Sequence, residues 1–252
     1  MDSRFSQIYL EPYFILINLL LIIGLIFFFR LNKDERTNIY YWLPFLILTF
    51  TVVYEDFAGY LVYNYELNKW VNEILGNEKN PNYNVWFYNF ANKYIATALY
   101  LFLIKTWLEP AKKKYITWMI FFYFFVILFL TGTGIEPVYL GQPIIFAIGA
   151  NMILVGSGLY FIGLISNEKY LESNPLRLLS FWQMTFILFT YSLTYISSVS
   201  VTYLYSVNKQ LGMSLFQIDW VMGVLNLSIL VLTIASPKLP GIFEKEPYYA
   251  AS

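Results

Sequence analysis

The residues of this chain best suited to chemistry are charged side chains inside apolar segments. Glu55 and Asp56 lie in an apolar stretch that ends near Asn64, and Lys93 lies in the next stretch, which begins near Asn84. A charged group at membrane depth is costly unless it is paired or hydrated, so such residues mark functional sites by default. The chemistry that they support is binding, through either an ion pair between two helices or a charged pocket for a small ligand.

Glu55 and Lys93 are expected to lie at the same depth. Each is nine residues from the end of its segment on the same side of the membrane, which corresponds to about 14 Å of helix. Consecutive helices are usually neighbours, so the two side chains are predicted to form a buried ion pair. Asn89 lies four residues before Lys93 and therefore on the same helix face.

Further polar residues fall in the same half of the predicted membrane region. Asp219 and Asn226 are seven residues apart on the last apolar segment and share a face, and the sixth segment has Ser and Thr residues towards its outer end. One interpretation is a water-accessible cavity that opens outward and is lined by Glu55, Asp56, Lys93, Asp219 and nearby hydroxyls. The alternative is hydrogen bonding between packed helices, with Asp56 and Asp219 close to lipid headgroups.

The composition explains why these charges must be positioned by membrane helices. Of the 252 residues 58% are hydrophobic and only 13% are charged, whereas a water-soluble domain has about a quarter charged residues. We therefore predict an all-α fold, a polytopic transmembrane seven-helix bundle that forms one domain over residues 1–252. The seven segments of spanning length are 13–30, 40–64, 84–108, 115–132, 139–166, 178–206 and 216–236.

The distribution of Lys and Arg predicts the orientation. The connections on one side contain eleven of these residues, including Lys112, Lys113 and Lys114, whereas the other side contains four. Because basic residues are retained in the cytoplasm, the N-terminus is expected outside and the C-terminus in the cytoplasm. The predicted location is the cytoplasmic (inner) membrane of a bacterial cell. The basic triplet is interpreted as a topology anchor rather than a site for a specific lipid.

Several classes of function are excluded by what the chain lacks. It has no cysteine and no histidine, which removes thiol nucleophiles, Ser-His-Asp relays and the usual zinc ligands. The formal net charge is zero, so no global field attracts nucleic acid. Glu55 and Asp56 point about 100° apart on a helix and cannot easily share one substrate atom. We expect neither an enzyme nor a metal site, and no cofactor.

Two other patterns predict structure around the segments. In the loop 65–83, apolar residues recur at helical spacing up to Gly76, which indicates an amphipathic helix at the interface or a lid over a cavity. In the fifth segment Gly149, Gly156 and Gly163 are spaced by seven residues, with Gly141 before them. Glycines on one face let neighbouring helices approach closely, so this face is predicted to pack inside the bundle.

Short motifs give the chain a family resemblance. They are Tyr54-Glu55, the stretch Asn84 to Asn89 (NVWFYN), Ser180-Phe181-Trp182 and Asn226. On these residues the chain resembles the small uncharacterised seven-helix inner-membrane proteins of Bacteroidota. The resemblance implies a seven-helix bundle with a sensory role and supplies no activity. Related chains have an acidic residue one turn after the Tyr-Asn pair, where this chain has Lys93.

The sequence thus favours a non-enzymatic receptor or sensor module in the lipid bilayer. An outward-facing pocket would bind a small-molecule ligand, and the signal would pass to a separate membrane or cytoplasmic protein. Glu55 and Lys93 would set the charge of that pocket, with Asp56, Asn89, Asp219 and Asn226 around them. The alternatives are a structural subunit of a larger membrane complex and, more weakly, an ion-coupled transporter that uses Glu55 or Asp219.

Overall fold

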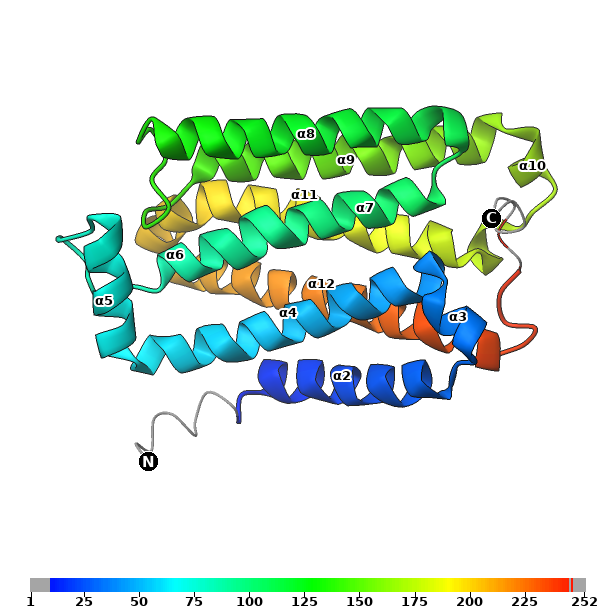
Figure 1. Ribbon diagram of the computed structural model, residues 1–252, viewed down its shortest axis with the longest axis horizontal. Coiled ribbons are helices and arrows are strands. Elements are labelled where there is room, and N and C mark those ends of the chain that lie inside the picture. Colours follow the sequence, from blue (N-terminus) through cyan, green and yellow to red (C-terminus); the bar gives the residue numbers. More distant parts are fainter. Residues whose placement is uncertain (1–9, 245, 247–252) are drawn as a thin grey trace.

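The computed structural model describes residues 10–244 and 246, with the side chains of 196–206, 209 and 216 excepted. The described part is helical throughout and contains no strand. Long helices run side by side and short ones connect them at the two ends of the bundle (Figure 1). The elements are α2 (Pro12–Arg30), α3 (Lys33–Thr37), α4 (Ile39–Tyr63), α5 (Tyr65–Leu75), α6 (Val85–Tyr88), η1 (Asn89–Ala96), α7 (Thr97–Trp107), α8 (Pro110–Gly132), α9 (Pro143–Ser166), α10 (Glu168–Leu171), η2 (Pro175–Arg177), α11 (Leu179–Val207), α12 (Lys209–Ala235) and η3 (Ser236–Lys238).

All seven apolar segments predicted from the sequence are helical. Five stretches within the described residues are long and apolar enough to cross a membrane, which indicates a membrane protein. These are Pro12–Arg30, Ile39–Tyr63, Pro110–Gly132, Pro143–Ser166 and Gln210–Lys238. The other two segments lie among them as α6, η1 and α7 in succession and as α11.

Proline and asparagine fix where most of these helices begin. Pro12, Pro110 and Pro143 occupy the first turn of α2, α8 and α9, where a missing N–H is not needed. Asn38 and Asn208 accept hydrogen bonds from the first turn of α4 and α12. Helix α8 therefore starts five residues before the predicted 115, and α12 starts seven residues before the predicted 216.

The third segment departs from regular α-helix at its middle. Residues Asn89–Ala96 form a π-helix between α6 and α7, and the three pieces run on without a break in helical conformation. Short π-helical insertions in α-helices are rare and occur frequently at functional sites. This irregularity changes which side chains of the segment face the centre of the bundle.

The core is shared by all the long helices, and α8 lies at its edge. Helix α8 packs against α7 and α9, and its outer face exposes Trp118, Phe121, Phe125 and Leu128. An apolar face of this kind suits the hydrocarbon of a bilayer. We infer that lipid covers this side of the bundle.

Two of the glycines in the fifth segment lie at close helix contacts. A Cβ atom at Gly149 would lie 2.8 Å from the Tyr123 hydroxyl oxygen. One at Gly156 would lie 3.1 Å from Ile116 Cδ1 and 3.2 Å from a methyl carbon of Ile104. The predicted packing face is therefore confirmed at these two positions. Gly141 lies before α9 and has no such neighbour.

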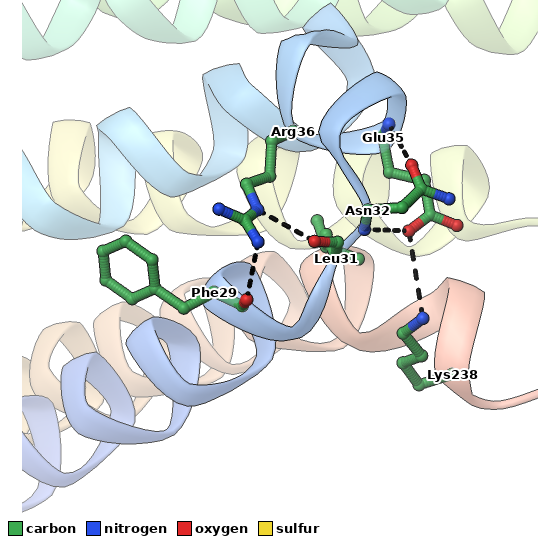
Figure 2. Close-up of polar contacts among 6 residues, drawn as sticks. All are labelled: Phe29, Leu31, Asn32, Glu35, Arg36 and Lys238. Atoms are coloured by element: carbon green, nitrogen blue, oxygen red, sulfur yellow. Dashed lines mark hydrogen bonds and ion pairs between the residues drawn. The ribbon is translucent and has the colours of Figure 1, made fainter.

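One end of the bundle gathers the turns that contain most of the basic residues (Figure 1). Figure 2 shows how the α2–α3 turn is fixed there. Asn32 and Glu35 form a reciprocal capping box, and Arg36 donates to the backbone oxygens of Leu31 and Phe29 at 2.8 and 2.9 Å. Lys238, at the end of the last helix, lies 3.9 Å from the Glu35 carboxylate. Arg4 and Lys245, which are among the fifteen basic residues counted for the predicted orientation, lie outside the described residues.

Helix α5 lies across the opposite end of the bundle (Figure 1). It ends at Gly76, whose φ of 79° is left-handed and suits glycine. The amphipathic helix predicted in this loop is confirmed, but its orientation differs from a simple apolar-face-inward arrangement. Asn68 and Asn72 are fully buried, whereas Trp70 is 60% and Ile74 is 66% exposed.

Buried hydrogen bonds explain why α5 turns its asparagines inward. The Asn72 amide donates to the backbone oxygens of Pro81 and Tyr83 at 2.9 and 2.8 Å, and the Asn68 amide donates to that of Leu61 at 2.6 Å. Unpaired backbone oxygens in a buried loop would be costly, so the Asn72 amide holds the 76–84 connection in place. The Asn68 amide instead ties α5 to the last turn of α4.

Candidate functional site

A cavity of about 290 Å³ lies between the helices, in the half of the bundle that contains the start of α2 and the second half of α4. Helices α2, α4, α11 and α12 and the third segment all contribute to its wall, and α9 adds one residue. The described lining residues are Tyr13, Thr51, Tyr54, Glu55, Tyr88, Asn92, Ala96, Tyr100, Phe146, Thr190, Tyr191, Thr194, Asp219, Trp220, Gly223, Asn226 and Leu227. This volume suits a small ligand rather than a drug-sized one.

The third segment presents a regular stripe to the cavity. Tyr88, Asn92, Ala96 and Tyr100 line it at intervals of four residues, and the middle two belong to the π-helix. Residues at this spacing share one face of a helix. Lys93, next to Asn92 in the chain, is rotated off this face and is not among the lining residues.

The cavity is acidic. Glu55 on α4 and Asp219 on α12 both line it, and among the described lining residues there is no Lys or Arg. The Thr194 hydroxyl lies 3.5 Å from a carboxylate oxygen of Asp219. A lining with two carboxyl groups and no basic side chain favours a positively charged occupant.

Asn226 also lines the cavity, and one of its side-chain atoms has no hydrogen-bond partner among the described residues. Its amide donates to the Tyr100 hydroxyl at 2.7 Å, whereas its side-chain oxygen is buried and accepts no hydrogen bond from the described residues. Buried polar atoms are nearly always paired, so this oxygen leaves unused hydrogen-bonding capacity next to the cavity.

Aromatic rings make up much of the remaining wall. Tyr13 stacks on Trp220, with ring centroids 5.6 Å apart, and Tyr100 meets Tyr191 edge to face at 5.5 Å. The faces of Tyr and Trp rings attract cations, and this attraction grows when water is excluded. The aromatic wall and the two carboxylates therefore favour the same kind of ligand.

The predicted ion pair between Glu55 and Lys93 is absent. The four ion pairs in the described part of the chain do not include it. The Lys93 Nζ instead lies 3.4 Å from the backbone oxygen of Gln142, and the Glu136 carboxylate attracts it electrostatically. Equal depth in the bundle does not suffice to predict an ion pair, because the direction of a side chain around the helix axis decides which neighbour it meets.

Two more of the predicted site residues lie outside the cavity. Asp56 accepts a hydrogen bond from the Asn18 amide at 3.0 Å and thereby joins α4 to α2. Asn89 is buried and donates to the backbone oxygens of Val138 and Leu140, both at 2.6 Å. Glu55, Asp219 and Asn226 are thus brought together, while Asp56, Lys93 and Asn89 are not. The Ser and Thr residues from Ser197 to Thr202 lie outside the described side chains.

Asn89 and Lys93 belong to a second polar cluster, around the start of α9. Glu136 is only 4% exposed, and its two oxygens accept the backbone N–H groups of Ile144 and Ile145 at 2.6 and 2.8 Å. The Gln142 amide donates to the Glu136 backbone oxygen at 2.8 Å. Glu136 therefore caps α9, and the cluster supports the fold of the α8–α9 connection.

Sequence reasoning did not identify Glu136 as a structural residue. An acidic residue close before a helix is a recognised start signal, but Glu136 lies seven residues before Pro143 and reaches the helix only because the loop folds back. The aromatic lining of the cavity, notably Tyr13 and Trp220, was also missed, because the two residues come from opposite ends of the chain. Nothing in the sequence around Tyr13 or Trp220 indicates that the two rings meet at a cavity.

Chemically, the cavity can bind and orient a small cation. Among the described residues no group of three or more His, Cys, Asp or Glu side chains lies close enough together to hold a metal ion. Comparison of the chain with protein-family models, with curated proteins and with solved structures found no match.

Proposed function

We propose that this protein is an integral membrane receptor-like module that binds a small organic cation in the Glu55–Asp219 cavity. The chain would cross a cytoplasmic-type membrane seven times, with α6, η1 and α7 together as one span and α11 as another. The N-terminus would lie outside, so the half of the bundle that contains the cavity would face the exterior. Ligand binding would alter the packing of α4, α12 and the third segment, and a separate partner would receive the signal.

The observation that supports this proposal best is the composition of the cavity wall. Glu55, Asp219, stacked aromatic rings and Asn226, whose side-chain oxygen has no hydrogen-bond partner among the described residues, all line one cavity. A cavity with this lining would attract a primary or quaternary ammonium through charge and through the ring faces. A neutral molecule of the same shape would gain only the apolar contacts.

A matched pair of probes tests the proposal. Choline and its neutral analogue 3,3-dimethylbutan-1-ol would be titrated into the full-length chain in lipid nanodiscs, with binding followed by calorimetry. Choline is expected to bind and the alcohol is not. Equal binding of both, or of neither, would contradict an organic-cation site.

Variants connect any binding to this cavity. Glu55→Gln and Asp219→Asn are each expected to weaken the binding of choline by roughly 2 kcal/mol, which is about thirtyfold in Kd. Asp56→Asn is the matched control, because Asp56 is adjacent in the chain but bonds to Asn18 outside the cavity. A control variant that lost binding as strongly as Glu55→Gln would indicate a general effect of membrane charge.

Ion-coupled transport is a second candidate, favoured by the π-helix at the cavity wall. Secondary transporters place substrate sites at interrupted helices near the middle of the membrane, and Asn92 and Ala96 of η1 line this cavity. Uptake of labelled choline into sealed proteoliposomes, lost in Glu55→Gln, would support transport. Saturable binding without uptake would favour the receptor.

A further inference from the structure

A second concave site lies at the other end of the bundle, on the outer surface. It has a volume of about 540 Å³ and runs along α7, with α4 on one side and the start of α8 on the other. Its wall includes Trp42, Leu46, Leu99 and Phe102, together with Lys105 and Lys113. The groove is separate from the acidic cavity, since the two have no lining residue in common.

The two lysines lie at one end of this groove. Lys105 is two residues from the end of α7, and Lys113 is in the first turn of α8, so both belong to the basic end of the bundle. Leu99 lies six residues before Lys105 on α7, and Leu46 lies seven residues after the start of α4 at Ile39. Both leucines are therefore about 10 Å further from the basic end of the bundle. The groove therefore changes from cationic to apolar along its length, in the direction from the membrane surface to its centre.

Neither lysine has a counter-ion in the part of the chain that the structure describes. Within the described residues no ion pair involves Lys105 or Lys113, and no Asp or Glu lines the groove. The neighbouring Lys112 differs, because its Nζ lies 2.6 Å from the Glu109 carboxylate. Two partly buried lysines with no carboxylate partner among the described residues favour an anion from outside the chain.

We infer that this groove binds an anionic glycerophospholipid of the surrounding leaflet. The phosphate would lie between the Lys105 and Lys113 ammonium groups, and the first part of an acyl chain would lie along Leu46, Leu99 and Phe102. Trp42, in the first turn of α4, also lines the groove and is partly exposed, and an indole ring suits the headgroup level. Basic pockets between membrane helices are suited to acidic lipid headgroups.

Native mass spectrometry of the full-length chain in a neutral detergent tests this inference. The probes are palmitoyl-oleoyl phosphatidylglycerol and the phosphatidylcholine with the same acyl chains, which differ in net charge. The phosphatidylglycerol adduct is expected to dominate. Replacement of both lysines in Lys105→Gln/Lys113→Gln should weaken that adduct about fivefold, which brings it to the level of phosphatidylcholine.

A charge-matched variant separates this groove from general surface attraction. Lys33→Gln/Lys114→Gln removes two exposed lysines at the same end of the bundle, neither of which lines the groove. It should keep the preference for phosphatidylglycerol. Leu99→Trp keeps both lysines and fills the apolar half, so it should weaken the adducts of both lipids.

Three results would overturn the inference. They are equal adducts of the two lipids on the wild-type chain, unchanged phosphatidylglycerol binding in Lys105→Gln/Lys113→Gln, and an equal loss in the charge-matched variant. Circular dichroism of each variant would show that the helices persist, so that lost binding is not lost folding.

Discussion

The ammonium of Lys93 lies 3.4 Å from the backbone oxygen of Gln142, although Asn92, the preceding residue, lines the acidic cavity. One step along the third segment therefore separates the positive charge from the two carboxylates. Together with Asn89 and Glu136, Lys93 stabilises the connection between α8 and α9. The cavity keeps the negative character that a lysine at this level would otherwise neutralise.

Removal of the Lys93 charge should affect stability and not ligand binding. Lys93→Met deletes the contact with Gln142 and the attraction to Glu136, so we expect the free energy of unfolding in detergent to fall by about 1–2 kcal/mol. The affinity for choline should stay within about twofold of the wild type, because no lining charge changes. Calorimetry and chemical denaturation of the same preparation would measure both. A large change in choline affinity would place Lys93 in the site after all.

The Glu136 carboxylate should be required for the start of α9. Glutamine at this position has one acceptor oxygen in place of two, so Glu136→Gln can satisfy only one of the Ile144 and Ile145 N–H groups. We expect a loss of about 1 kcal/mol in the free energy of unfolding. Glu172→Gln, at an exposed acidic residue, is the control and should change it by less than about 0.5 kcal/mol. Equal effects would refute the cap.

The helical architecture could be predicted because it follows from local properties of the chain. Apolar length marks the segments, although α8 and α9 begin at Pro110 and Pro143 rather than at the predicted 115 and 139. The heptad glycines predicted a close contact, which the structure places at Gly149 and Gly156. Each of these signals is contained within a few turns of one helix, so no knowledge of the neighbours is needed.

The site could be predicted only in part because it depends on rotation about each helix axis. Of the residues predicted from depth and spacing, Glu55, Asp219 and Asn226 line one cavity, whereas Lys93, Asp56 and Asn89 do not. A shift of one residue turns a side chain by about 100°, and the π-helix at Asn89–Ala96 alters the phase of its segment further. No residue type or spacing in that stretch predicts the π-helix.

The close contact at Gly156 should not tolerate a larger side chain. A leucine there would collide with Ile116 and Ile104, so Gly156→Leu is expected to cost about 1–3 kcal/mol of stability. Gly158 is on the same helix, and a Cβ atom at that position would have no neighbour within 4 Å, which makes Gly158→Leu the matched control. Thermal unfolding in detergent should show a lower midpoint for the first variant alone. Similar midpoints would mean that α9 does not pack as described.

A buried chain of hydrogen bonds among three side chains should couple α7, α11 and α12 energetically. The Trp107 indole donates to the Gln183 side-chain oxygen, and the Gln183 amide donates to the Thr233 hydroxyl, both at 2.5 Å. Gln183→Leu leaves the indole N–H unpaired and is expected to cost about 1–3 kcal/mol. A double-mutant cycle with Trp107→Phe should give a coupling of at least about 0.5 kcal/mol. Additive effects would show that the two side chains do not act together.

The C-terminal segment should pack more tightly at acidic pH through Glu246. Its carboxyl oxygens accept the backbone N–H and the hydroxyl of Ser180 at 2.9 and 2.7 Å, and Tyr160 bonds the same hydroxyl at 2.6 Å. Burial raises the pKa of Glu246 from 4.5 to about 7, against which the Ser180 hydrogen bonds act only partly. Because the docked state holds the proton more tightly than the undocked state, docking is strongest below pH 4.5 and weakens as pH rises to about 7.

A spin label can follow this docking, since the chain has no cysteine of its own. A nitroxide at Ile242→Cys, an exposed position four residues before Glu246, should become more mobile between about pH 5 and pH 8. Glu246→Gln is neutral at every pH and should abolish that change. Arg177 and Glu244 form an exposed ion pair beside it at 3.4 Å, and Tyr40 also faces the carboxyl group. Mobility that still rises with pH in the glutamine variant would assign the effect to those groups and refute the role of Glu246.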